Sequence, residues 1–353
     1  MGVIEHNIVY KQRGRYGGWP ANHGGWSWGN EILISFQDCE DSGVWEDHHS
    51  VVRDCERYMI FARSYDGGRS WRIERPAIKH VTDETKGPVS SDDILPCPGS
   101  IDFSHPDFCA SFTLSGTSAE YPSWWVYSTD RGHHWSAPYA IPTLGFTGVN
   151  ARTDYHVQSS SEMIVFLTMT KEDGDEGRVV CTRLSGGGSG WELIGCLGDE
   201  PEGWEIMPAS ARRENGDWVC LVRGQTRRTP EGFREWYMSQ YHSGDGGVTW
   251  QFDRKIIPNS DNSNPPALVV MKDGRWCLAY GWREEPYGLR CRFSHDEART
   301  WGPEHILRDD AACWDLGYPR MAQNEAGEMV VAYYYNDTTE GERYIAATIF
   351  GED

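Results

Sequence analysis

Side chains suited to acid–base, nucleophilic or carboxylate-binding chemistry gather in short segments spread along the whole chain. Arg, His, Tyr, Glu and Asp recur in residues 18–26, 100–105, 150–155, 205–208, 262–265 and 315–320. Guanidinium groups bind carboxylates through paired hydrogen bonds, whereas His, Glu and Tyr transfer protons or attack carbon. Segments this far apart in sequence form one site only if a repeating fold brings their ends together.

An internal repeat predicts such a fold. Four segments share the pattern Ser-x-Asp-x-x-x-x-Trp, and they begin at Ser64, Ser128, Ser243 and Ser294; a worn fifth copy runs from Ser185 to Trp191. Apolar or β-branched runs precede and follow each copy, as expected for strands joined by a hairpin. Consecutive copies are 51 to 64 residues apart, a period typical of β-propeller blades.

Counting strands around these hairpins predicts an all-β, six-bladed β-propeller that forms one domain over residues 1–353. The blades are expected at about 15–85, 97–145, 147–197, 204–257, 262–308 and 315–350. The last blade lacks a fourth strand, while the strand at residues 4–10 has no partner nearby in sequence. Pairing these two closes the ring and removes an open sheet edge.

The four repeats resemble the Asp-boxes, or BNR repeats, of the sialidase superfamily, and the resemblance covers about residues 15–350. It implies a glycoside hydrolase that acts on carbohydrate. It also implies that the repeats lie at the blade periphery, away from the site. We therefore expect a structural role for Asp66, Asp130, Asp245 and Asp296.

The resemblance assigns a nucleophile and its base. The segment from Gly317 to Tyr333 is similar to the sialidase segment in which a tyrosine precedes a glycine hairpin, and Tyr318 takes the place of that tyrosine. A neutral nucleophile suits a substrate whose anomeric carbon bears a carboxylate, because an Asp or Glu attacker would be repelled. A tyrosine needs an adjacent carboxylate base, and Glu205 is the expected partner.

Sialidases hold the substrate carboxylate with three arginines, and this sequence departs from that pattern. Arg223 matches the second arginine, and Arg283 or Arg290 lies where the third is supplied. The first is missing, since Gly18-Trp19-Pro20 stands at the usual Arg-Ile-Pro. We expect other residues to rebuild the sugar pocket with a different geometry: Arg152, Arg320, Arg15, Tyr155 and Trp19.

The general acid of the family is an Asp on the loop that leaves the first blade, here residues 38–49. Asp47 is the expected acid, and His48 or His49 could replace it with a pKa nearer neutrality. We predict no metal site, because adjacent histidines on an extended loop point apart and no third ligand is evident. No phosphate-binding glycine loop is present, so no cofactor is expected.

Two other functions stay open. His23, flanked by Gly24, Gly25 and Trp26, is similar to the pocket histidine of propeller enzymes that process rhamnosyl–glucuronic acid linkages, which predicts a lyase or rhamnosidase. The third hypothesis is a propeller lectin without catalysis. The leading prediction is an exo-acting, sialidase-like hydrolase that removes a terminal acidic sugar.

Composition limits the partners. The net charge is −20 and the mean hydropathy is −0.62, which argue against nucleic acid and anionic membranes. No apolar run of roughly 18 residues is present.

The first residues lack a signal peptide, so we expect a cytoplasmic protein or an exported one whose leader was removed. The ten cysteines are expected to be free thiols, with Cys39–Cys55 as the alternative bridge. Oligomeric state is not determined by the sequence.

Overall fold

The computed structural model describes residues 2–43, 49–52, 55, 57–75, 94–114, 123–260 and 264–351. These residues form β-strands and one short 3-10 helix, η1 (Pro20–Asn22), and the strands make six antiparallel sheets. The predicted fold class, an all-β six-bladed β-propeller, is confirmed. The described chain divides into two compact units, which are treated separately below. That the chain folds as a single domain stays a prediction.

Unit 1 comprises the described residues up to 75 and from 264 onward, and it holds three sheets. The first contains β2 (Arg15–Gly18), β3 (Gly24–Trp28), β4 (Glu31–Glu40), β5 (Tyr58–Ser64) and β6 (Arg72–Glu74). The second contains β19 (Ala267–Val270), β20 (Trp276–Trp282), β21 (Gly288–Ser294) and β22 (His305–Arg308). The third contains β1 (Gly2–Tyr10), β23 (Gly317–Gln323), β24 (Met329–Tyr335) and β25 (Tyr344–Gly351).

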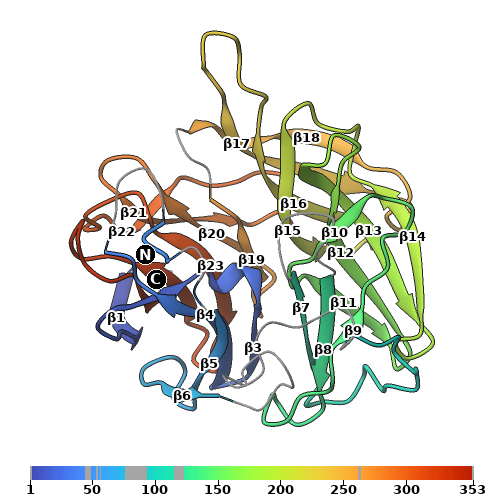
Figure 1. Cartoon of the computed structure of the whole chain (residues 1–353), viewed down its shortest axis with the longest axis horizontal. Helices are drawn as coiled ribbons and strands as arrows, with labels where there is room; N and C mark the ends of the chain where they lie inside the picture. The colour runs from blue at the N-terminus through green and yellow to red at the C-terminus, as the bar shows by residue number, and fades with distance from the viewer. Residues whose placement is uncertain are drawn as a thin grey trace. The chain divides into compact units, whose positions relative to one another are not determined.

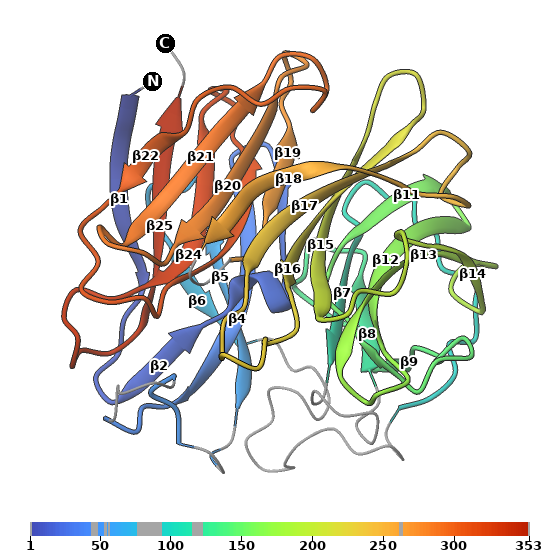
Figure 2. The same cartoon turned by 90° about the horizontal axis from the view of Figure 1, so that it is seen from above.

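The first strand of the chain completes the last sheet. β1 pairs antiparallel with β25, with Gly2 opposite Gly351 and Tyr10 opposite Ile345, and the two strands lie side by side in Figure 2. The predicted pairing of residues 4–10 with the last blade is confirmed. The pairing satisfies the backbone groups that an edge strand would leave exposed.

Unit 2 comprises the described residues from 94 to 260 and also holds three sheets (Figure 1). The first contains β7 (Cys109–Leu114), β8 (Ser123–Ser128) and β9 (Tyr139–Ala140). The second contains β10 (Gly148–Asn150), β11 (Tyr155–Ser159), β12 (Glu162–Thr170), β13 (Glu176–Ser185) and β14 (Gly190–Cys196). The third contains β15 (Trp204–Arg212), β16 (Trp218–Gln225), β17 (Trp236–Ser243) and β18 (Gln251–Ser260).

The repeated Ser-x-Asp segments form hairpin turns that are hydrogen-bonded internally. In the first, the Asp66 carboxylate accepts from the Ser64 hydroxyl at 2.8 Å and from the Ser70 amide at 2.8 Å. The indole of Trp71 donates to the Gly68 carbonyl at 3.0 Å. Equivalent carboxylate bonds occur at Asp130, Asp245 and Asp296. Each carboxylate is therefore used by its own turn.

Buried side chains from neighbouring sheets form separate apolar clusters within each unit. All ten cysteines lie in the described residues and are free thiols, Cys39 and Cys55 included. Burial raises the pKa of the thiols of Cys181 and Cys220, as expected for packing groups. None of the described residues belongs to a helix with the length and apolarity of a membrane span.

Candidate functional site

Five side chains of unit 1 meet in a polar group that we call the Asp315 cluster: Tyr16, His49, Asp315, Tyr334 and Arg343. The Asp315 carboxylate accepts from the Tyr334 hydroxyl at 2.8 Å and from Nε of Arg343 at 3.1 Å. Its Oδ1 lies 2.7 Å from Nδ1 of His49, and Tyr16 donates to it at 3.2 Å. Asp315 lies two residues before β23, so the segment that leads into that strand carries the charge that organises the cluster.

Asp315 is an ionised, buried carboxylate. Its side chain is 1% exposed. Burial acts to raise its pKa, but the neighbouring His49, Arg343 and Arg283 outweigh it and lower the pKa to about 2. A buried charge is stable only when partners replace its lost water, and the two tyrosines and Arg343 do so here.

His49 joins this carboxylate to the surface. Its side chain is 36% exposed, and the ring lies edge-on to Trp19 at 5.1 Å and 5.5 Å from the ring of Trp314. The ring of Tyr16 stacks on that of Trp19 at 4.7 Å, which fixes the position of the Trp19 ring beside His49. Because Nδ1 of His49 contacts the Asp315 carboxylate, Nε2 is the ring nitrogen that can contact a ligand.

Tyr318 adopts a strained backbone beside the cluster. Its φ is 50° and that of Gly317 is 106°, in the left-handed region that bulky residues rarely occupy. Asn264 holds this turn, since its Oδ1 accepts from the Tyr318 amide at 2.8 Å and its Nδ2 donates to the Leu316 carbonyl at 3.1 Å. Strain maintained in this way is typical of functional sites.

Arg283 connects Tyr318 to the Asp315 cluster. Its Nη2 donates to the Tyr334 hydroxyl at 2.7 Å and its Nε to the Leu316 carbonyl at 3.0 Å. The guanidinium carbon lies 5.5 Å from the centre of the Tyr318 ring and 5.3 Å from that of Trp314. With Arg343, two guanidinium groups thus act on the Asp315 carboxylate and lower its pKa.

An open groove adjoins the segment that leads into Asp315. It has a volume of ≈ 480 Å³ and is lined by Glu285, Pro286, Tyr287, Asp309, Ala311 and Ala312. This volume lies within the usual range of small-molecule sites. Its two carboxylates and one aromatic ring suit the hydroxyl groups and the apolar face of an uncharged sugar.

Two of the predicted arginines are held by other groups of unit 1, Arg290 by backbone carbonyls and Arg15 by a carboxylate. Arg290 donates to the carbonyls of Leu289 at 3.1 Å, Arg308 at 2.6 Å and Pro286 at 3.0 Å. Arg15 forms an ion pair with Asp38 at 2.8 Å. Their guanidinium groups fix loops and strand ends of unit 1, so we leave both out of the proposed site.

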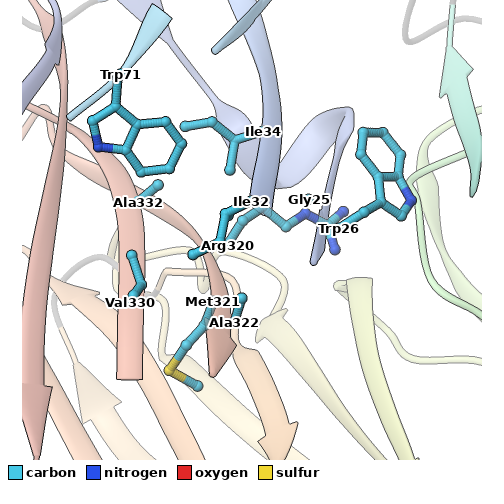
Figure 3. Close-up of a pocket in the computed structure, with 10 residues that line it drawn as sticks. All are labelled: Gly25, Trp26, Ile32, Ile34, Trp71, Arg320, Met321, Ala322, Val330 and Ala332. Carbon is cyan, nitrogen blue, oxygen red and sulfur yellow. The ribbon is translucent and has the colours of Figure 1, made fainter. Parts of the chain in front are cut away.

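Arg320 lies along an apolar seam between β3–β4 and β23–β24. Figure 3 shows it next to Gly25 and Trp26, with Trp71 at the other end of the seam. The enclosed space is ≈ 10 Å³, room for about one water molecule. Nη2 of Arg320 donates to the Ala21 carbonyl at 2.6 Å. This seam has no space for a sugar.

His23 and Trp19 flank η1 at the start of the same sheet. His23 is 5% exposed, and its backbone amide donates to the Pro20 carbonyl at 3.1 Å. Trp19 has a φ of 55° and is 7% exposed, with its ring against Tyr16 and His49. The structure thus brings Trp19 into contact with the Asp315 cluster.

Other predicted residues lie in unit 2. Glu205 is 5% exposed and its Oε2 accepts from the Tyr241 hydroxyl at 2.8 Å. Burial raises the pKa of Glu205, and hydrogen bonds from Tyr241, Ser239 and Tyr237 oppose that rise without cancelling it. A carboxyl group with a raised pKa is suited to proton transfer near neutral pH. Its pairing with Tyr318, which belongs to unit 1, stays a prediction.

Three further residues of unit 2 were predicted to bind the sugar. Arg223 is 6% exposed, with its guanidinium carbon 5.2 Å from the Trp204 ring. Arg152 donates to the carbonyls of Asn150 at 3.3 Å and Ala151 at 3.2 Å. The hydroxyl of Tyr155 accepts from the Ala110 amide at 3.1 Å. These bonds join Arg152 and Tyr155 to backbone groups, and Nη2 of Arg152 also lies 3.6 Å from the Glu176 carboxylate.

Asp47 and His48 lie outside the described residues, so their predicted role as acid stays a prediction. The neighbouring His49 is described, and it contacts Asp315. The sequence offered His49 only as an alternative, and it did not single out Tyr334, Arg343 or Asn264. The one available signal was the position of Asp315, three residues before the predicted nucleophile. Within the described part of the chain, no group of three or more His, Cys, Asp or Glu is placed to hold a metal ion.

Comparisons with known proteins agree with this architecture. The family model of the BNR repeat-like domain matches residues 109–331, well over half of the chain. No curated protein matches the sequence. The sequence-based resemblance is therefore confirmed at the level of the repeat.

Solved structures share the fold across the whole chain. A Dyadobacter fermentans protein of unknown function matches with a TM-score of 0.76 and 20% identity, over 100% of this chain and 99% of that chain. The α-L-arabinanase of Penicillium chrysogenum, complexed with arabinobiose, gives 0.62 and 12%, over 98% of both chains. A Trypanosoma rangeli sialidase mutant with trans-sialidase activity gives 0.55 and 12%, over 94% and 54%. At these sequence identities, the structural similarity establishes a shared fold and nothing more specific.

Proposed function

This chain belongs to the family of BNR repeat-like domain proteins, and we propose that it is a glycoside hydrolase that removes a terminal acidic sugar from a glycan. The observation that carries the proposal is the pair of His49 and Asp315, a partly exposed imidazole fixed at 2.7 Å by a buried, ionised carboxylate. The glycosidases with the same fold support the substrate class.

The pair supplies acid–base chemistry. Asp315 holds the ring of His49 in one orientation, so that Nε2–H can protonate the departing glycosidic oxygen. The oxygen of Tyr318 attacks the anomeric carbon and gives a glycosyl–tyrosine intermediate, with Glu205 as the proposed acceptor of the phenol proton. Neutral His49 then takes a proton from the water that attacks the same carbon. The bond from that carbon to the Tyr318 oxygen breaks, Glu205 returns its proton to this oxygen, and the sugar is released.

Charge favours an acidic terminal sugar. The guanidinium groups of Arg283 and Arg343 lie near the Asp315 carboxylate, and the indoles of Trp19 and Trp314 stand beside His49. In a chain of net charge −20, such local compensation is required to attract an anion. The groove beside Tyr287 then takes the uncharged remainder of the glycan.

The test is a screen of sugars released from sialylated, uronate-containing and rhamnose-capped glycans by the wild type and by His49→Gln. Glutamine keeps a polar group of similar reach but cannot act as a proton donor at neutral pH. Release of an acidic monosaccharide by the wild type, reduced at least about 100-fold in the variant, supports the proposal. Equal rates in the two proteins would refute the role of His49.

The same screen separates the other two hypotheses. Formation of an unsaturated uronate, detected by its ultraviolet absorbance, would show that the protein is a lyase and not a hydrolase. Loss of that product in His23→Ala would assign the lyase chemistry to His23. Glycan binding without release of any sugar would favour the remaining hypothesis, a propeller lectin without catalysis.

A further inference from the structure

The hairpin between β16 and β17, residues 226–235, concentrates positive charge in an acidic chain. It contains Arg227, Arg228 and Arg234 against Glu231 and Glu235, while the whole chain has a net charge of −20. In Figure 1 this hairpin extends away from the rest of its sheet beside the β17 label. Arg227 and Arg228 are exposed and Arg234 is partly exposed, so a large ligand can reach them.

The hairpin is held in a defined shape. The Thr226 amide donates to the Glu235 carbonyl at 2.9 Å, and the Glu235 amide donates to the Thr226 hydroxyl at 2.9 Å. The Thr229 amide donates to the Phe233 carbonyl at 2.7 Å. Lys255 forms an ion pair with Glu235 at 2.6 Å, so this carboxylate is already neutralised and does not compensate the arginines.

Two of the arginines repel each other. Burial and the nearby guanidinium of Arg228 both lower the pKa of Arg234. Arg227 lies 3.6 Å from Asp173. Among the described residues, neither Arg228 nor Arg234 has an ion-pair partner within 4 Å. A bound anion would relieve this repulsion.

Aromatic rings lie next to these charges. The guanidinium carbon of Arg234 is 4.8 Å from the centre of the Trp236 ring, and Trp236 meets Trp204 edge to face at 5.4 Å. Phe233, near the tip, is 66% exposed. Guanidinium groups bind carboxylates, and flat rings pack against the apolar faces of sugars. The combination fits a sugar chain that bears carboxylates.

We propose that this surface, formed by Arg228, Phe233, Arg234, Trp236 and Trp204, binds a carboxylate-bearing polysaccharide. It lies in unit 2 and contains no residue of the Asp315 cluster, and its two indoles adjoin the guanidinium of Arg223. Nucleic acid is disfavoured, because its affinity depends on many phosphate contacts and the net charge of the protein opposes them. The proposal takes only the chemical class of its ligand from the proposed function.

The experiment is calorimetric titration of the full chain with an oligogalacturonate, and with dextran of similar length as the uncharged probe. The Arg228→Gln/Arg234→Gln double variant is expected to bind oligogalacturonate at least tenfold more weakly, and Phe233→Ala several-fold more weakly. The matched control, Arg183→Gln/Arg299→Gln, removes two partly exposed arginines elsewhere and is expected to bind as the wild type does. Affinity should fall as salt is raised.

Equal affinity in the double variant and the wild type would overturn the proposal, as would binding of dextran as tight as that of oligogalacturonate. Equally tight binding of single-stranded RNA, lost in the same variant, would make the surface a general polyanion site and reject the carbohydrate assignment. Absence of sugar release refutes only the proposed hydrolase, because this binding is measured without turnover.

Discussion

Nδ1 of His49 lies 2.7 Å from Oδ1 of Asp315, although the two residues are 266 positions apart in the sequence. His49 belongs to the connection between β4 and β5, and Asp315 precedes β23, so the contact joins two sheets of unit 1. A carboxylate that is 1% exposed thereby fixes the orientation of an imidazole that is 36% exposed. This is the relation on which the proposed proton transfer depends.

Tyr318→Phe is expected to remove most turnover and leave the fold intact, because it deletes one hydroxyl and little volume. We expect kcat to fall by about 100-fold or more, and Glu205→Gln to be similarly damaging if the two residues act as a unit. The double variant should then be no worse than either single variant. Steady-state kinetics and thermal melting of all three proteins provide the measurement.

A matching prediction concerns His23, the residue that the alternative hypothesis places in the site. His23→Ala should be milder than Tyr318→Phe, affecting KM more than kcat. An inactive His23→Ala protein together with an active Tyr318→Phe protein would reverse the assignment and favour chemistry directed at a uronate.

Asp315→Asn should destabilise the protein strongly. The substitution removes the charge that faces Arg343 at 3.1 Å in a site where both side chains are 1% exposed. Breaking a buried ion pair by removing one partner costs about 3–5 kcal/mol. Asp337→Asn is the control, since Asp337 pairs with Lys11 at the surface, with side chains 47% and 36% exposed, and should cost less than about 1 kcal/mol. Urea unfolding compares the two, and equal stabilities would contradict the prediction.

Asn264→Ala is expected to release the strained turn at Tyr318. The side chain of Asn264 is buried and bonds both the Tyr318 amide and the Leu316 carbonyl. The Leu316 carbonyl keeps its hydrogen bond from Nε of Arg283, so the main loss is the bond to the Tyr318 amide, which costs about 1–3 kcal/mol. Both stability and kcat should fall, whereas Asn215→Ala at an exposed turn should change neither. A fully active Asn264→Ala enzyme would show that the turn does not position Tyr318.

The protein should lose stability in mild acid through His156. Burial lowers the pKa of His156 from 6.5 to about 4, so between these values the unfolded chain binds more protons than the folded one. Stability therefore falls as pH drops through this window, by up to about 3 kcal/mol. His156→Gln keeps a donor for Ser210, whose hydroxyl lies 2.8 Å from Nε2 of His156.

The check is chemical unfolding of both proteins at about pH 7 and about pH 4.5. The change in unfolding free energy between the two pH values should be smaller in His156→Gln. An identical change in both proteins would assign the acid sensitivity to other groups.

Asp66→Ala tests the structural role of the repeated turns. The carboxylate of Asp66 accepts hydrogen bonds from Ser64, Arg69 and Ser70 within its own hairpin. We expect a lower melting temperature and an unchanged kcat. Loss of turnover at unchanged stability would place Asp66 in the site and contradict its assignment to the blade periphery.

The sequence by itself determined the features that depend on local contacts or on counting. Each repeated turn closes within eight residues, so the spacing of Ser64, Asp66 and Trp71 is enough to predict it. The pairing of β1 with β25 followed from an unpaired first strand and a last blade one strand short. Tyr318 was singled out because its neighbours in the chain formed a recognisable segment.

Only the tertiary structure decided which polar side chains meet. In sequence, Arg283, Arg290 and Arg320 are equivalent candidates, yet the first bonds Tyr334, the second backbone carbonyls and the third lies along a narrow apolar seam. His49 and Asp315 are likewise joined by no period or motif. The reason is physical: a hairpin is specified by the conformations of adjacent residues, whereas the partner of a buried charge is set by which distant strands pack together and exclude water from it.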